Sequence, residues 1–448
     1  MNKLVYSIIL AVFFSSYLAS GIHRAFNLVP EILSGIVLVV ILARIATYRS
    51  LCLSPKYLVL GVLAVLHAVS GMILNTVDPG TIVTGLRPYL KWIPLFLLPA
   101  VYRFSEQEIS GQIKLILILG LMQSPLAFFQ RFVQYRDAAT GDFVTGTLGE
   151  SASGVLSIFL LSVIAVVIAF YVRGRLRFPQ MLLLTLALFL PTTINETKVT
   201  LLLLPLAIVV PYIVASNRLS MAQLVVIPVL GALLTTGFVV IYDYAGSMWG
   251  ARGISEFVDK EADSYLYSES DATRENLLEK NRIGSGLQLP EELITPDEGG
   301  GRVEKLLLPL KNLSDNPLRL WVGLGVGNAS PSIINVFSGT YSGRIGKISS
   351  ETLSSFLLWE VGVGGIIILF TFLIILMYDT YKIGKEKNTL GVLAAGWFGV
   401  LVIVLLTVPY LNLFYANVLV FLFAYISGYI SAERRWAQYN PVRTTLHS

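Results

Sequence analysis

Five basic residues of this sequence lie close to the ends of apolar segments, and their type suits the binding of an anionic ligand. They are Arg87, Lys91, Lys198, Arg302 and Arg344. Charges at or near membrane depth are costly and are usually paired or functional. Arginine can hold phosphate oxygens with two parallel N–H groups. A cluster of such cations therefore predicts a site for a diphosphate.

Lys198 is the clearest of these residues, because it lies in a polar connection so short that it must be at the membrane edge. Arg87 and Lys91 are four residues apart, which places them on one face of a helix. A structural role is the alternative for all of them. They would then reach up to lipid headgroups or form ion pairs with Glu196 and Asp78.

Two carboxylates near a late apolar run are candidates for proton transfer. Glu351 follows two serines, and we expect it in the first turn of a helix, where a carboxylate commonly caps the helix and complements its dipole. The same place, at the outer mouth of a bundle, suits a general base that removes a hydroxyl proton. Glu360 lies deeper in the same run. A carboxylate at that depth is a functional candidate, with hydrogen-bonded packing as an equal alternative.

The sequence predicts no metal, nucleotide or cofactor site. Its three histidines lie outside the polar stretch 243–352, so a histidine zinc site is not expected there. Asp259, Glu261 and Asp263 alternate as cation ligands can, but a solvated acidic segment explains them better. The single cysteine, Cys52, allows no intrachain disulfide and predicts a structural thiol. The glycine run 323–328 is typical of turns and close packing.

The elements that position these residues are predicted from composition. The chain is 55% hydrophobic and 14% charged, against about 25% charged residues in soluble domains. Its mean hydropathy is +0.71. Apolar runs recur at the length a helix needs to cross about 30 Å of hydrocarbon. The sequence predicts an all-α polytopic membrane protein with about 12 transmembrane helices, at approximately 4–20, 28–47, 57–74, 82–101, 112–130, 151–172, 179–195, 199–215, 221–242, 353–378, 389–408 and 411–431.

The distribution of Lys and Arg predicts that both termini are cytoplasmic, because the short segments then on the inside hold most of these residues. The net charge of +5 is thus a feature of topology and does not indicate nucleic-acid binding. The predicted organisation is helices 1–9 over 1–242, a large external loop over 243–352, helices 10–12 over 353–431 and a cytoplasmic tail over 432–448.

The large loop divides into two parts. Residues 255–298 are acidic and polar, which predicts a flexible lid or a partly disordered stretch. Residues 299–301 are three consecutive glycines that separate this stretch from the next one. Residues 303–313 are apolar on a helical period, which predicts an amphipathic external helix lying on the bundle.

A family pattern is visible between residue 301 and residue 365. It consists of an Arg after a small residue, an amphipathic helix, x-Pro-Leu, a glycine-rich G-x-G, and then a polar residue opening a helix that reads E-x-G-x-x-G. Here these parts are Gly301-Arg302, the helix 303–313, Asn316-Pro317-Leu318, Gly323-Leu-Gly-Val-Gly-Asn328, Glu351 and Glu360-Val361-Gly362-Val363-Gly364-Gly365. Together with the late external loop, this pattern resembles the O-antigen polymerase and O-antigen ligase superfamily (Wzy-type and WaaL-type proteins).

This sequence departs from the family pattern at two places, and these bear on the choice between a polymerase and a ligase. Ligases carry a His where this sequence has Glu351, and many members have Ser-Arg where it has Thr197-Lys198. The missing His favours a polymerase over a ligase.

The resemblance implies a GT-C-like bundle in the bacterial inner membrane with a periplasmic loop between helices 9 and 10. It implies transfer of an undecaprenyl-diphosphate-linked glycan onto another lipid-linked repeat unit, without cofactor or metal. Glu351 would be the catalytic base. Arg302 and Lys198 would hold the diphosphate, with Arg344 or Arg87 assisting. Partners would be the lipid-linked oligosaccharide, membrane lipids, and a chain-length regulator and a flippase of the same pathway, with no nucleic acid.

Three alternatives stay open from the sequence. One is a ligase-type transferase to lipid A-core or protein. A second is a transporter or flippase of lipid-linked oligosaccharide, although the sequence lacks the repeated halves that transporters usually show. A third is a structural partner of a glycan-export machine. The sequence indicates neither the sugars and their linkage nor the choice between O-antigen, capsule and exopolysaccharide.

Overall fold

The computed structural model describes residues 1–48, 51–138, 141–149, 152–216, 221–248, 302–332 and 335–439. In these ranges every regular element is a helix and none is a strand. Residues 255–298, with their alternating acidic residues, and the glycines 299–301 lie outside the described part. Seven helical segments are long and apolar enough to cross a membrane: Asn2–Gly21, Arg24–Tyr48, Pro55–Leu74, Glu106–Gln134, Ser153–Val172, Leu353–Gly384 and Thr389–Thr407. The prediction of an all-α multi-pass membrane protein is confirmed, and the count of twelve spans stays a prediction.

The N-terminal part has one helix for nearly every predicted span, because each apolar run is long enough to satisfy its own backbone hydrogen bonds inside a membrane. The bounds are α1 (Asn2–Gly21), η1 (Arg24–Leu28), α2 (Val29–Tyr48), α3 (Pro55–Leu74), α7 (Glu106–Phe129), η2 (Gln130–Gln134), η3 (Gly141–Phe143), α8 (Ser153–Val172), α9 (Phe178–Ile194), α10 (Val199–Ala215) and α11 (Met221–Met248).

The predicted span 82–101 is the exception, and the prediction of one continuous helix there is wrong. The chain forms three short helices instead, α4 (Pro79–Gly85), α5 (Arg87–Leu90) and α6 (Ile93–Val101). Each of the three has a proline in its first two positions. Proline has no N–H to donate and is favoured at a helix start, so each proline begins a new helix. The break leaves Arg87 and Lys91 in short α5 and just after it.

The C-terminal part contains α15 (Arg302–Leu313), α16 (Pro317–Val322), η5 (Asn335–Phe337), α17 (Ser342–Glu351), α18 (Leu353–Gly384), α19 (Thr389–Thr407) and α20 (Asn417–Tyr439). Helix α15 coincides with the predicted amphipathic segment. Glu351, expected in the first turn of the tenth spanning helix, is instead the last residue of α17. The reason is that Thr352 caps α18, where its hydroxyl accepts a hydrogen bond from the Ser355 N–H at 3.1 Å.

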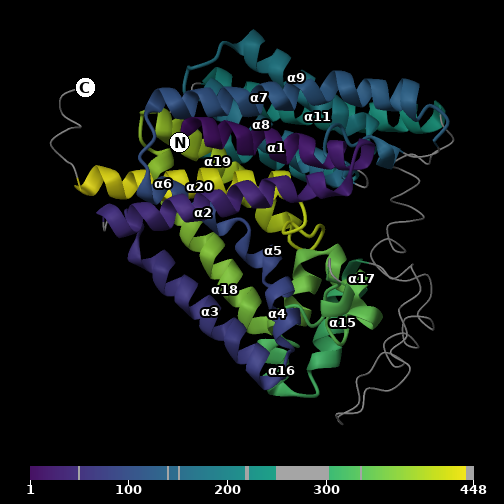
Figure 1. Ribbon diagram of the computed structural model, residues 1–448. Helices are drawn as coiled ribbons and strands as arrows, with labels where there is room; N and C mark the ends of the chain where they lie inside the picture. Colours follow the sequence, from purple (N-terminus) through teal and green to yellow (C-terminus); the bar gives the residue numbers. More distant parts are fainter. Residues whose placement is uncertain are drawn as a thin grey trace.

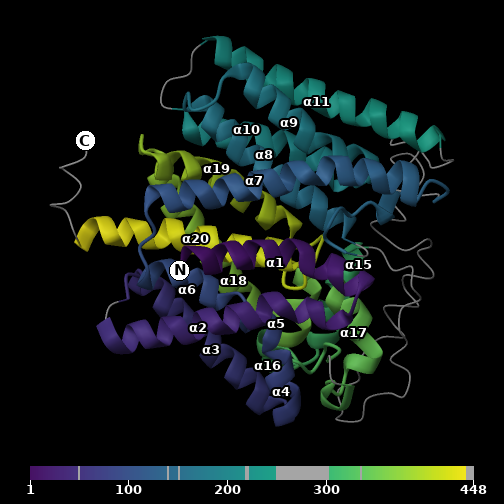
Figure 2. The ribbon, with the colours of Figure 1, turned by 45° about the horizontal axis from the view of Figure 1, so that its top comes forward.

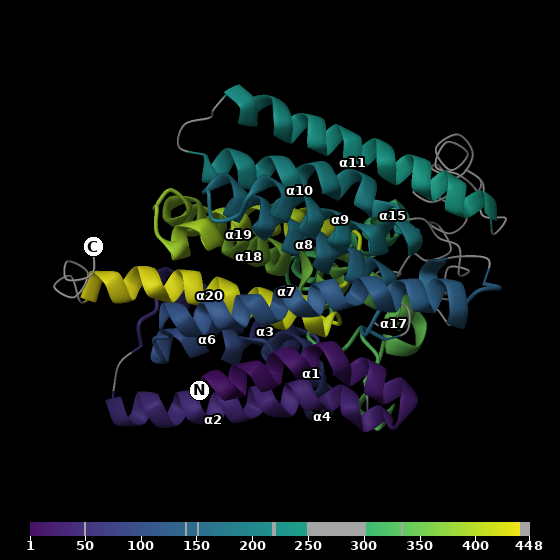
Figure 3. The same cartoon turned by 90° about the horizontal axis from the view of Figure 1, so that it is seen from above.

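Most helices of the bundle run roughly along one direction, and α3 and α18 cross them obliquely (Figure 1). Viewed from above, α11 lies at one edge, α2 at the other, and α8 lies between them (Figure 3). Accordingly α8 is the most buried of the spanning helices and α3 the least. Helix α1 begins and α20 ends at the same end of the bundle, and α15 and α17 lie toward the opposite end (Figures 1 and 2).

Near the C-terminal end of α20, Asp379 connects three helices. Its carboxylate contacts Lys56 Nζ of α3 and Arg434 Nη1 of α20, both at 2.5 Å, and accepts a hydrogen bond from the Tyr57 hydroxyl at 2.9 Å. Asp379 is buried, whereas the two cations are about one-third exposed.

We expect Asp379→Ala to lower the free energy of unfolding by about 1–3 kcal/mol, because the buried Tyr57 hydroxyl loses its acceptor. The two cations can turn toward water, so their loss of a partner adds less. The measurement is the thermal unfolding midpoint in detergent. Glu386→Gln, an exposed charge change, is the control, and equal midpoints for the two variants would contradict this account.

Candidate functional site

The glycine run after α16 packs against the point where α18 is broken. Gly362 has φ +63° and ψ −165°, so the helix is interrupted there. Gly323, Gly325 and Gly327 also have positive φ, of +72°, +93° and +82°. Only glycine adopts these conformations without strain. The prediction that these residues serve turns and close packing is confirmed.

The break in α18 exposes backbone carbonyls, and other elements supply their donors. The N–H of Leu324 donates to Trp359 O at 2.7 Å, and the N–H of Gly325 donates to Glu360 O at 3.0 Å. His67 Nε2 of α3 lies 2.8 Å from Val361 O. Buried backbone groups need such partners. The motif glycines and the E-x-G of α18 therefore form one joint, although they are far apart in the sequence.

Close approach explains why a side chain does not fit in this joint. A Cβ on Gly327 would lie 2.5 Å from Thr81 O and 2.9 Å from Gly85 Cα, both in α4. We expect Gly327→Ala to destabilise the protein by at least the ~1–3 kcal/mol typical of a strained backbone position. Gly343→Ala is the matched control, since nothing lies within 4 Å of its Cβ and the residue is helical. Thermal unfolding in detergent measures both, and equal stability of the two variants would contradict the close approach.

Glu360 is fully buried beside this joint and is completely occupied by hydrogen bonds. Its Oε2 accepts from the Tyr89 hydroxyl at 3.0 Å, and its Oε1 accepts from the Ser330 hydroxyl. The backbone N–H groups of Gly327 and Ser330 donate to it as well. The Tyr89 ring stacks on Phe356, with ring centroids 5.4 Å apart. Glu360 thus joins the region after α4, the glycine run and α18, and the geometry favours the packing role over a catalytic one.

A polar cavity of about 210 Å³ lies near the C-terminal end of α1 and the first residue of α20. It is lined by Ser16, Asn27, Arg87, Lys91, Tyr415 and Asn417 together with one proline. Both of its basic residues form ion pairs with the same carboxylate, that of Glu31. Arg87 donates from Nε and Nη2 to Glu31 at 2.5 and 2.7 Å, and Lys91 Nζ lies 3.7 Å from the same carboxylate.

The structure therefore pairs Arg87 with Glu31, which was not foreseen from the sequence. Asp78, considered as a partner for it, instead caps α4, where its carboxylate accepts from the Gly80 N–H at 2.9 Å. Lys91 also donates to Asn417 Oδ1 at 2.7 Å. Lys91 is buried and Arg87 is about one-third exposed.

Glu351 forms an ion pair with Lys305 of α15, and its side chain is about one-third exposed. Arg302, the first residue of α15, precedes Lys305 by one helical turn. The Arg302 and Arg344 side chains lie outside what the structure describes. Backbone hydrogen bonds also connect Glu351 to a residue that lines the polar cavity. Its carbonyl accepts from the Asn412 N–H at 3.1 Å, and the Asn412 carbonyl accepts from the N–H of Tyr415, a cavity residue, at 3.1 Å.

No protein-family model matches this chain, and no curated protein matches it.

Lys198 lies between α9 and α10 next to a buried ion pair. Glu196 binds Arg131 of η2 at 3.2 Å, and the Arg131 side chain is completely buried. Glu196 has φ +56°, a conformation that costs a non-glycine residue about 1–3 kcal/mol and is common at functional sites. Burial raises the pKa of the Glu196 carboxyl above its ordinary value. The Gly141 N–H, Arg131 and Lys198 act in the opposite direction but do not cancel this effect. The sequence suggested Glu196 as an ion-pair partner for the candidate cations, but it did not identify Arg131 as that partner.

A series of contacts relates Lys198 to Glu351. Asn195, at the end of α9, donates to the Ser153 carbonyl at the start of α8 at 3.0 Å. The next residue, Gly154, packs against the ring of Tyr410, which lies just before Asn412, the residue bonded to Glu351. The residue before Glu196 is therefore connected to the backbone of Glu351 through the start of α8 and the segment between α19 and α20.

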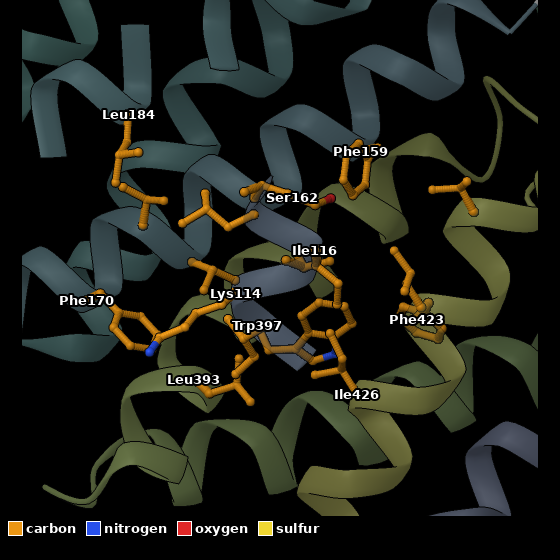
Figure 4. Close-up of a pocket in the computed structure, with 18 of the residues that line it drawn as sticks. Lys114, Ile116, Phe159, Ser162, Phe170, Leu184, Leu393, Trp397, Phe423 and Ile426 are labelled. Carbon is orange, nitrogen blue, oxygen red and sulfur yellow. The ribbon is translucent and has the colours of Figure 1, made fainter. Parts of the chain in front are cut away.

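A second, larger cavity is apolar and runs along helices α7, α8, α9, α19 and α20 (Figure 4). Its volume is about 260 Å³. Leu176 and Thr389 line it near the basic connections after α8 and α18, and Val418 and Leu419 line it at the start of α20. Among the described residues that line it, Lys114 alone carries a charge, and its side chain is labelled in Figure 4. Val418 is next in sequence to Asn417, which lines the polar cavity.

Proposed function

We propose that this protein is a surface-polysaccharide polymerase of the bacterial inner membrane. It transfers a glycan from undecaprenyl diphosphate onto another lipid-linked repeat unit at the periplasmic face. The observation that carries the proposal is the pair of adjacent cavities at the start of α20. One is apolar and lies among spanning helices, and the other is polar and contains two cations. A substrate with a lipid chain and a sugar head requires both.

The orientation in this proposal follows the basic residues, which place both termini in the cytoplasm. The first residues of α1 and the last residues of α20 lie at the same end of the bundle, which agrees with that assignment (Figure 1). The end that carries α15, α17 and Glu351 is then periplasmic. No nucleotide is needed there, because the diphosphate already activates the donor sugar.

In the proposed reaction the acceptor hydroxyl oxygen forms a bond to the anomeric carbon of the donor sugar. The bond from that carbon to the diphosphate oxygen breaks, and undecaprenyl diphosphate leaves with the bonding electron pair. Glu351 takes the hydroxyl proton as general base. Arg302 and Lys198, assisted by Arg344, stabilise the charge that develops on the leaving diphosphate. Arg302 opens the helix whose Lys305 contacts Glu351.

Deletion of the gene, with complementation by the wild-type chain, tests the function. Single repeat units on the cell surface of the deletion strain, with long chains restored by the wild type, are the expected result. Loss of all surface units, with lipid-linked material retained inside the cell, would favour a flippase instead. Long lipid-linked chains that are never attached to an acceptor would favour a ligase.

A further inference from the structure

The polar cavity has a composition that selects one class of sugar. Four of its side chains, Ser16, Asn27, Tyr415 and Asn417, are neutral hydrogen-bonding groups. Such groups recognise hydroxyls, because each can donate and accept. No carboxylate lines the cavity in the described part of the chain, while Arg87 and Lys91 both do. An engineered apolar cavity of about 150 Å³ already holds a benzene ring. A volume of about 210 Å³ is therefore enough for one substituted six-membered ring.

The charge of this cavity matches one carboxylate better than a diphosphate. Glu31 neutralises one of the two cations, so the group carries a net charge of about +1 when all three residues are ionised. Arg87 already uses Nε and Nη2 on Glu31, so this paired edge of its guanidinium is not available for a phosphate. Arginine has five N–H donors in total. Its remaining donors and the Lys91 ammonium can still reach a single anionic group.

We infer that this cavity binds an acidic sugar, a monosaccharide unit that carries a carboxylate, within the lipid-linked substrate. The inference rests on the proposed function, and it assigns Arg87 to sugar recognition in place of diphosphate binding. The backbone of the cavity is connected to that of the proposed base. Tyr415 lines it and is bonded through Asn412 to the backbone of Glu351. Tyr415 also contacts Ser330, which bonds to the buried Glu360.

Binding of two probe sugars to the purified full-length protein in nanodiscs tests the inference. The probes are methyl glucuronide, which has a carboxylate, and methyl glucoside, which has none. By isothermal titration calorimetry we expect the glucuronide to bind at least about tenfold more tightly, the equivalent of one favourable charge interaction. Arg87→Gln should reduce this preference to within about twofold. Equal binding of both sugars by the wild type, or no saturable binding of either, would overturn the inference.

Glu31→Gln separates recognition from a structural role. It removes the carboxylate that competes for both cations, so glucuronide affinity should rise severalfold, whereas a merely structural ion pair would give weaker binding. Lys387→Gln, the same charge change as Arg87→Gln at an exposed residue after α18, should leave the preference unchanged. A loss of preference in Lys387→Gln would also contradict the assignment.

Failure of the inference and failure of the proposed function give different results. Binding is measured without turnover, while the deletion strain reports chain length without reference to the cavity. A polymerising protein with no glucuronide preference would reject only the acidic sugar. A glucuronide preference in a protein whose deletion leaves chain length unchanged would reject the polymerase.

Discussion

Glu351→Gln should reduce polymerisation by about 10²–10⁴-fold, the range that a positioned general base contributes. The amide keeps the size of the side chain and can still accept a hydrogen bond from Lys305, so the contact between α15 and α17 is largely retained. Only the ability to take up a proton is lost. The measurement is the rate of chain extension in proteoliposomes that contain the purified variant and a lipid-linked repeat unit.

Two further variants make this prediction specific. Glu386→Gln removes an exposed carboxylate after α18, near the basic connection, and should extend chains at the wild-type rate. Lys305→Met removes the ion-pair partner but keeps the carboxylate, so it should lower the rate less than Glu351→Gln does. Wild-type chain lengths with Glu351→Gln would remove Glu351 from the mechanism. A loss of folded protein with that variant would show that its role is structural.

Much of the fold follows from the sequence because hydropathy alone determines where a chain can cross a membrane. Each predicted apolar segment contains helix, and α15 coincides with the predicted amphipathic segment. The prediction of one continuous helix over 82–101 was wrong because it considered hydropathy alone, although Pro88 and Pro94 already indicated breaks. The prediction that Glu351 lies in the first turn of the tenth spanning helix was also wrong. The residue that caps this helix is Thr352, whose hydroxyl accepts a hydrogen bond from the N–H of Ser355.

The site was harder to predict because its contacts join distant segments. Arg87, Lys198 and Glu351 were singled out by their type and position as charged residues that need an explanation. Their surroundings, however, are set by tertiary packing. Glu31 reaches Arg87 from α2, and Lys305 reaches Glu351 from α15. A single sequence shows which residues carry a charge, but it does not show which of these residues contact one another in the fold. The glycine run was read correctly because positive φ is a local property of the residue type.

Glu360→Leu should destabilise the fold more than any other single change considered above. Leucine fills the place with an apolar side chain that accepts no hydrogen bond, so the Tyr89 and Ser330 hydroxyls lose their acceptor in a fully buried place. The N–H groups of Gly327 and Ser330 lose it as well. Each buried donor left without a partner costs about 1–3 kcal/mol, and a small native stability does not tolerate several such losses. We therefore expect little folded protein by size-exclusion chromatography.

Glu360→Gln distinguishes this packing role from a catalytic one. The amide oxygen retains one acceptor, so the variant should fold with a lowered thermal midpoint and should still extend chains. If it folded normally but did not polymerise, Glu360 would belong to the chemistry and not to the joint between the glycine run and α18. If Glu360→Leu were as stable as the wild type, the hydrogen bonds at this joint would not hold the broken helix. The position of Glu351, which ends α17 directly before the residue that caps α18, would then need another explanation.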